Sequence, residues 1–320
     1  HLYHRRQRQM CIRDRSQCLI ALLIDNCCLN MENLFLDPFT ILLIAGFIGF
    51  FMAFGIGAND VANSMGPSVG SKAITIKQAI IIAAIFEFLG AFLAGGEVTS
   101  TIRKGIVDPL IYANDINIFI IGMMSALLAG GTWLYIASLR GWPVSTTHSI
   151  VGSIIGFVLI TKGVDAVSWG TVGNIAMSWV TSPVFSAVLA YCLYISAKKL
   201  ILDRPEPENA AITYIPFYSV FVAAVISLVT ARKGLKHVGI EWSENEIYLF
   251  ILIFSMFVGA VTAFILRTNK EKIMQNDGIE YAFGLLMIVS AAAMAFAHGS
   301  NDVANAIGPL AAIVSVVDTG

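Results

Sequence analysis

The chain has 320 residues, of which 57% are hydrophobic and only 13% charged. Soluble domains carry about a quarter charged residues, so this composition excludes an ordinary soluble enzyme and predicts an all-α membrane protein with several spans. The formal net charge of -1, from 20 basic and 21 acidic residues, gives no indication of a nucleic-acid-binding protein.

Residues 1–30 differ in character from the rest of the chain. They hold four of the five cysteines, and their apolar run at 18–24 is short and ends at Asp25. A signal peptide and a cysteine cluster that binds metal or forms disulfides are weaker interpretations, because the spacing is not that of a zinc site. We interpret the segment as a non-native or disordered leader, upstream of a protein that opens at Met31.

From Met31 onward, apolar runs alternate with short polar breaks. Each run is long enough to form a helix, and a helix satisfies its own backbone hydrogen bonds in lipid. The expected spans are 39–57, 78–96, 117–139, 144–161, 172–197, 215–231, 247–266 and 280–297, with a last apolar stretch at 303–317. Basic residues occur on both sets of loops, so the Lys/Arg asymmetry rule does not assign an orientation.

An internal repeat organises these spans. Residues 52–67 read MAFGIGANDVANSMGP and residues 294–309 read MAFAHGSNDVANAIGP, with eleven of sixteen positions identical at an offset of 242. Seven steps separate the spans that precede the two copies, which predicts antiparallel helices and an inverted-repeat transporter. The parity changes if the motif segment is itself a full span. We divide the chain into the leader at 1–30, a first transmembrane repeat at 31–200, connecting spans and loops at 201–279 and the start of a second repeat at 280–320.

The repeated motif carries polar chemistry at membrane depth. Its Gly and Pro residues are expected to loosen the helix beside protein or a water-filled cavity. Asn59 and Asn63 share one helix face, and Asp60 inside a membrane costs roughly 3 kcal/mol and therefore requires a partner. A contact between helices held by Asn and small residues is the simpler alternative. The acid occurs in both copies, however, and this favours a cation site.

Two further polar features lie within the apolar runs. Glu87 stands near the middle of the run 78–96, where a carboxylate is a functional candidate, although a protonated structural Glu is an alternative. The segment Pro143–His148 opens an apolar helix with three hydroxyl residues beside free backbone N–H groups, an arrangement suited to a phosphate. Ordinary N-capping by Ser or Thr is the alternative, and His148 is equally well explained as a packing residue.

These residues resemble the inorganic phosphate transporter family (the Pit, or solute carrier 20, family). The resemblance runs from about residue 40 to the end and is carried by GANDVANSMGPSVGS at 57–71, IFE around Glu87, TIRKGIVD at 101–108, PVSTTHSIVGS at 143–153, SWVTSP at 178–183 and AHGSNDVANAIGP at 297–309. It implies symport of inorganic phosphate with Na⁺ or H⁺, two inverted repeats and a homodimer. It places the protein as a multi-pass component of the plasma or inner membrane.

The resemblance also implies roles for individual residues. Phosphate binding falls to Ser145, Thr146, Thr147, Asn63 and Asn305. Cation binding and coupling fall to Asn59, Asp60, Glu87, Asn301 and Asp302, with Na⁺ at Asn59, Asp60, Asn301 and Asp302. His148 and His298 are additional candidates. No cofactor is expected beyond the coupling ion.

The charges themselves suggest how such a protein works. Phosphate is an anion, and carboxylates near it repel it unless a cation intervenes, which predicts cation-coupled transport by alternating access. A carrier of another oxyanion, such as sulfate or arsenate, keeps the same architecture. A membrane-embedded enzyme is disfavoured because neither G-x-S-x-G nor H-E-x-x-H is present. A purely structural membrane protein does not explain the repeated acid. A channel would differ from a carrier because a cation gradient cannot concentrate the solute that flows through it.

The sequence departs from the family pattern at its end. A second half is expected to carry its own glutamate-bearing helix and a second P-V-S-T-T-H-like segment. Adding the repeat offset of 242 to position 87 gives position 329, whereas the sequence ends at Gly320. We therefore expect a C-terminally truncated chain whose second repeat is incomplete.

Overall fold

The computed structural model describes residues 36–96, 106–113, 115–234, 242–275 and 278–319. The described part is a bundle of helices without a strand. The leader at 1–30 and residues 101–105 of the TIRKGIVD segment lie outside it, so the interpretations given to them stay predictions.

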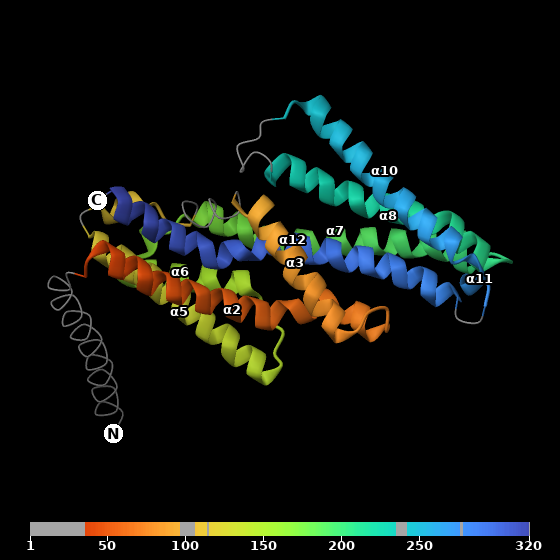
Figure 1. Cartoon of the computed structure of the whole chain (residues 1–320). Helices are drawn as coiled ribbons and strands as arrows, with labels where there is room; N and C mark the ends of the chain where they lie inside the picture. The colour runs from red at the N-terminus through yellow and green to blue at the C-terminus, as the bar shows by residue number, and fades with distance from the viewer. Residues whose placement is uncertain (1–35, 97–105, 114, 235–241, 276–277, 320) are drawn as a thin grey trace, which may run out of the picture.

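Eight long helices build the bundle (Figure 1). They are α2 (Pro38–Gly70), α3 (Ile76–Ala94), α5 (Ile116–Arg140), α6 (Thr146–Thr161), α7 (Trp169–Ala197), α8 (Pro207–Val229), α10 (Glu244–Thr268) and α12 (Gly278–Thr319). Short turns of helix join them at η1 (Pro109–Tyr112), η2 (Val164–Ala166), η3 (Lys198–Leu202), η4 (Thr230–Gly234) and α11 (Lys270–Ile273). Among the described residues, seven helices are long and apolar enough to cross a membrane, and α6 is a shorter apolar helix.

Side-chain caps explain where several helices begin. Asp37 accepts a hydrogen bond from the backbone N–H of Thr40 at the start of α2. Thr75 and Gln78 form a reciprocal capping box at the start of α3, as Ser243 and Glu246 do for α10. These polar caps satisfy the first N–H groups of each helix at the point where the apolar sequence starts.

The predicted ends of the spans at the repeated motif are wrong, and the Gly and Pro residues expected to loosen the helix do not break it. The first copy lies inside the continuous helix α2, and the second lies inside α12, which replaces the two separate stretches predicted at 280–297 and 303–317. Pro67 and Pro309 each remove only one backbone N–H, and the rest of each helix keeps its bonds. Gly55 of the first copy and Gly299 of the second allow a neighbouring helix to approach closely, whereas Gly57 and Gly66 face open space.

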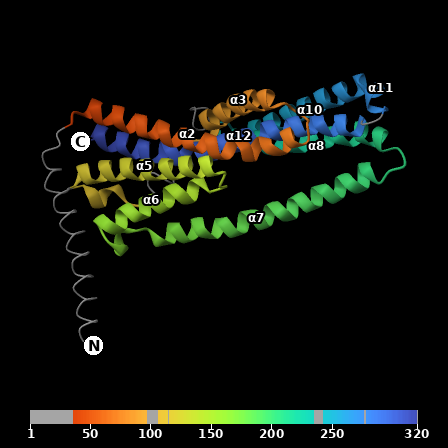
Figure 2. The same cartoon turned by 90° about the horizontal axis from the view of Figure 1, so that it is seen from below.

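The two motif-bearing helices are antiparallel neighbours, as the repeat predicts. α2 and α12 run side by side in opposite directions in both views (Figure 2). Gly49 near the start of α2 faces Leu310 near the end of α12, and Asp60 farther along α2 meets the earlier residue His298. Antiparallel pairing of the two copies is the geometry that an inverted repeat requires.

Helix α3 crosses α12 at two glycines. A Cβ on Gly299 would overlap the backbone carbonyl of Glu87, and a Cβ on Gly90 would overlap the carbonyl of Phe296. Small residues at such a crossing let two backbones approach closely in a membrane. The crossing brings Glu87 of α3 next to the second copy of the motif.

The remaining helices differ in how much apolar surface they bury. The largest buried apolar cluster joins α2, α5, α6 and the end of α12, and a separate cluster joins α8, α10 and the start of α12. By contrast, α7 has no buried residue and runs apart from the other long helices over much of its length (Figure 2), with contacts to α6 at Trp179 and to α8 at Ser196. Its apolar side chains, such as Phe185 at 75% exposure, are suited to lipid.

Candidate functional site

The two copies of the motif meet around one imidazole, that of His298 on α12. Its Nδ1 lies 3.1 Å from Oε1 of Glu87 in a hydrogen bond. Its Nε2 lies 2.9 Å from Oδ2 of Asp302 and 3.6 Å from Oδ2 of Asp60. Nε2 has no hydrogen-bond partner among the described residues, so its contacts with the two aspartates are electrostatic. Three helices therefore place three carboxyl groups around one ring.

Asp60 and Asp302 are close enough to repel one another strongly. Their carboxylate oxygens and Nε2 of His298 lie within 4.8 Å of each other, and the side chains of the two aspartates are only 13% and 16% exposed. Two unit charges at this separation repel by roughly 3–4 kcal/mol at an effective dielectric constant of about 20. A positive charge between them removes this repulsion, so the arrangement suits a bound cation.

Asparagines orient both aspartates in the same way. Nδ2 of Asn59 donates to Oδ1 of Asp60 at 2.8 Å, and Nδ2 of Asn301 donates to Oδ1 of Asp302 at 3.3 Å. Asn59 also donates to the carbonyl of Val144 at 2.8 Å, which ties α2 to the segment before α6. Since both N–H groups of Asn59 are used, its Oδ1 is left as an acceptor for a cation.

Asn305 connects the second copy of the motif to the first turn of α6. Its Nδ2 lies 3.3 Å from Oγ1 of Thr146, 3.2 Å from Oγ1 of Thr147 and 3.4 Å from Oδ1 of Asp302. Asn305 is 1% exposed and Thr146 is 3% exposed. The threonine hydroxyls and the unpaired N–H groups of the helix start are donors that suit an anion. They lie next to the carboxylates that suit a cation.

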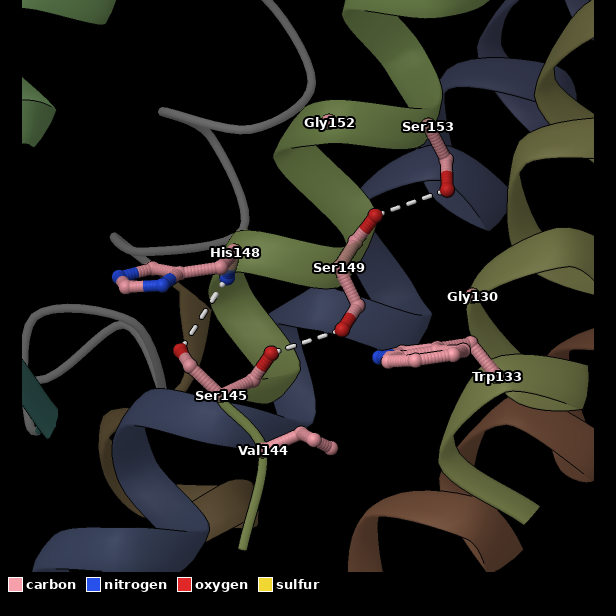
Figure 3. A pocket seen from close by; sticks show the side chains of 8 residues that line it. All are labelled: Gly130, Trp133, Val144, Ser145, His148, Ser149, Gly152 and Ser153. Atoms are coloured by element: carbon pink, nitrogen blue, oxygen red, sulfur yellow. Dashed lines mark hydrogen bonds between the residues drawn. The ribbon is translucent and has the colours of Figure 1, made fainter. Parts of the chain in front are cut away.

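A cavity of about 550 Å³ opens on the other side of the same helix start (Figure 3). It is lined by Ser145, His148, Ser149 and Ser153 of this segment and by Trp133 of α5. Ser149 and Ser153 donate to backbone carbonyls four residues earlier, and each oxygen still has room to accept or to contact a polar solute. The cavity is thus a hydroxyl-lined space next to the carboxylates that surround His298.

Of the serines that line this cavity, Ser145 was predicted from the sequence, whereas Ser149 and Ser153 were not. Ser145, Ser149 and Ser153 follow at intervals of four residues, a spacing that places them on one face of a helix. This spacing is a signal that could have identified them. Trp133 gave no such signal, because a single aromatic residue in an apolar run is typical of any membrane helix.

The structure brings together most, but not all, of the residues singled out from the sequence. The cluster gathers Asn59, Asp60, Glu87, His298, Asp302, Asn305, Thr146 and Thr147. Asn63 and Asn301 are exposed, so they do not repeat the burial of their partners Asn305 and Asn59. Ser145 caps α6 by accepting from the N–H of His148, and it lines the cavity instead of joining the cluster. The centre of the His148 ring lies 3.7 Å from the centre of the Trp179 ring on α7.

Comparison with known proteins gives this geometry a context. Residues 56–319 match the phosphate transporter family. A protein from Haemophilus influenzae named as a phosphate permease is 50% identical over 281 residues, which cover 87% of this chain and 67% of that protein. The chloroplastic inorganic phosphate transporter 2-1 of Arabidopsis thaliana is 40% identical over 298 residues, covering 85% of this chain and 50% of that protein.

A solved structure is similar over the same region. The chain superimposes on a structure titled as the sodium-dependent phosphate transporter with a TM-score of 0.80 and 39% identity, over 88% of this chain and 69% of that one. The chain therefore spans about half to two thirds of the length of its relatives. With its apolar spanning helices and its doubled motif, it is a multi-pass membrane protein and belongs to the phosphate transporter family.

Proposed function

We propose that the full-length protein carries inorganic phosphate across a membrane together with a cation, by alternating access. The observation that carries this proposal is the pairing of two opposite kinds of site within one cluster. The carboxylates of Asp60 and Asp302 suit a cation, while the hydroxyls of Thr146 and Thr147 and the N–H groups at the start of α6 supply donors suited to an anion. A cation site directly beside an anion site is expected where the two ions bind together.

Charge explains why the two solutes depend on each other. A phosphate anion that approaches Asp60 and Asp302 without a cation meets two like charges. A bound cation neutralises this repulsion and attracts the phosphate, so each solute raises the affinity for the other by the same factor. The sodium-dependent phosphate transporter of similar fold supports Na⁺ as the coupling ion. Asn and Asp oxygens are suited to such a hard cation.

Access to the site is proposed to alternate by movement of one repeat against the other. Asp60 belongs to α2 and His298 to α12, so the cluster lies between the two antiparallel copies of the motif. A change in the angle between these helices would separate the groups that hold the cation. We place the protein in the plasma or inner membrane as a homodimer, and we assign it no enzymatic activity.

The substrate is tested by competition. Uptake of labelled phosphate by the full-length protein in proteoliposomes should fall when unlabelled phosphate is added. An equal excess of sulfate, which carries no proton at neutral pH and therefore cannot donate a hydrogen bond, should have little effect. Arsenate shares the charge and protonation of phosphate and is expected to compete. Stronger competition by sulfate than by phosphate would overturn the assignment of phosphate.

The threonine hydroxyls give a second test of the anion site. In Thr147→Val the side chain keeps its shape but loses its Oγ1, which lies 3.2 Å from Asn305. A hydrogen bond to a charged group is worth about 1.5–3 kcal/mol, so the half-saturating phosphate concentration should rise about tenfold or more. Thr213→Val is the matched control, because that exposed threonine bonds only to the carbonyl of Asn209. An unchanged half-saturation in Thr147→Val would reject the anion site.

A further inference from the structure

A second cavity lies away from the cluster, where the loop between α2 and α3 meets the start of α12. Its volume is about 340 Å³, within the range of small-molecule sites. Lys72 and Ala73 of the loop form one wall, and Glu280, Leu285 and Ile288 of α12 belong to the other. Ten residues of helix, or roughly 15 Å, separate Ile288 from His298 along α12, so this cavity is not part of the phosphate site.

An unusual backbone conformation places Lys72 at this cavity. Lys72 has a φ of 60° and is the only non-glycine residue with a positive φ in the described part of the chain. It ends α2 in a position where Gly is usual. Its N–H donates to the carbonyl of Val69 at 3.0 Å, and that of Ala73 donates to the carbonyl of Ser68 at 3.1 Å. A left-handed residue with a Cβ is strained, and such strain is concentrated at functional positions.

Two opposite charges line the cavity without neutralising one another. Lys72 supplies an ammonium group and Glu280 a carboxylate. Neither forms an ion pair with any residue that the structure describes. Behind them the wall is apolar, formed by the half-buried side chains of Leu285 and Ile288. A ligand that fits this wall therefore has one negative group, one positive group and an apolar part.

The cavity also lies where the ends of three membrane-length helices meet, and this is where a membrane surface is expected. The loop with Lys72 joins two membrane-length helices, and Glu280 lies in the first turn of a third. Tyr281, which also lines the cavity, has Nζ of Lys272 4.1 Å from its ring centre, and tyrosines are enriched at the interface between lipid and water. Ile76, three residues beyond Ala73, is 66% exposed and suited to lipid chains.

We propose that this cavity binds the headgroup of phosphatidylethanolamine from the surrounding bilayer. In this arrangement Lys72 pairs with the lipid phosphate, Glu280 accepts hydrogen bonds from the lipid ammonium, and the acyl chains leave along the apolar wall. The order of the charges suits this lipid above others. Phosphatidylglycerol lacks the cation, so Glu280 repels it. Phosphatidylcholine has a cation without N–H donors, so it cannot donate to Glu280.

The proposal is tested by native mass spectrometry on the purified chain. The lipids are phosphatidylethanolamine, phosphatidylglycerol and phosphatidylcholine with identical acyl chains, and soluble glycerophosphoethanolamine serves as a headgroup without chains. The unaltered chain should retain phosphatidylethanolamine at least fivefold better than either other lipid, and the soluble headgroup only weakly. Equal retention of the three lipids would overturn the proposal, and strong retention of the soluble headgroup would overturn its assignment to a lipid.

Reversing the charges of Lys72 and Glu280 tests whether the lipid binds in this cavity. Lys72→Glu and Glu280→Lys should each abolish the preference for phosphatidylethanolamine, and the double reversal should restore part of it. Lys77→Glu is the matched control, because this lysine is exposed on α3 and does not line the cavity. A preference that survives either single reversal, or that is lost in Lys77→Glu, would contradict the assignment.

Lys72→Gly separates binding from folding. Glycine adopts a positive φ without strain, so this variant should have a melting temperature equal to or above that of the unaltered chain in the absence of lipid. It should nevertheless lose the preference for phosphatidylethanolamine, because the ammonium group is gone. If Lys72 served only to end the helix, Lys72→Gly would keep the preference, and this result would refute the site.

Discussion

In Asp60→Asn, cation-driven phosphate uptake by the full-length protein should fall at least a hundredfold, to background. The substitution preserves the shape of the side chain and removes the negative charge, so the cation loses a ligand 3.6 Å from the imidazole of His298. A loss of one charge-assisted interaction of about 3 kcal/mol corresponds to more than a hundredfold in binding. The measurement is initial uptake of labelled phosphate into proteoliposomes under a Na⁺ gradient.

Folding and charge count need separate controls for this variant. The amount of Asp60→Asn in the membrane and its melting temperature should match those of the unaltered protein, since Asn59 can still donate to the new amide oxygen. Asp203→Asn removes the same charge from an exposed position outside the cluster and should transport normally. Uptake of normal rate and cation dependence in Asp60→Asn would show that the cation does not bind between the two motif copies.

The largest effect on stability is expected from Gly299→Ala. A Cβ at this position would overlap the backbone carbonyl of Glu87, and a backbone carbonyl cannot rotate away as a flexible side chain can. Overpacking typically costs 1–3 kcal/mol, and we expect a loss of about 3 kcal/mol or more in the free energy of unfolding. Gly90→Ala, which meets the carbonyl of Phe296 at the same crossing, should destabilise the chain similarly.

Thermal unfolding of the chain in detergent measures this effect. Gly46→Ala is the matched control, because no atom lies within 4 Å of a Cβ added to this glycine of α2. Alanine favours the helix over glycine by up to about 1 kcal/mol, so the control should unfold at the same temperature or slightly higher. Equal melting temperatures for Gly299→Ala and Gly46→Ala would mean that α3 and α12 do not cross at this glycine.

Local sequence patterns predicted much of this arrangement. The apolar runs predicted the membrane helices, because a span of about 20 apolar residues needs no tertiary information. The doubled motif predicted two antiparallel helices with Asp60 and Asp302 in equivalent positions, and both aspartates accept from the asparagine that precedes them. Identical local sequence gives identical local geometry, which explains this success.

The predictions that failed depended on contacts between helices, which local sequence does not reveal. Gly and Pro were expected to loosen the helix, but Gly299 serves the close crossing with α3, a contact that no local pattern contains. Likewise Asn59 donates to the carbonyl of Val144, and a backbone acceptor has no signature in the sequence. Asn63 and Asn305 are equivalent in the repeat, yet only Asn305 is buried, against Thr146 and Thr147 of α6.

The central claim is that a cation held between the two motif copies makes phosphate binding possible, and accumulation against a gradient tests it most directly. Proteoliposomes with the full-length protein are loaded with labelled phosphate at equal concentration on both sides. A Na⁺ gradient is then imposed, and in a parallel sample a pH gradient of equal driving force. The account predicts that phosphate accumulates with the Na⁺ gradient, and that Asp60→Asn abolishes the accumulation. Phosphate that merely stays at equal concentration under both gradients would contradict it.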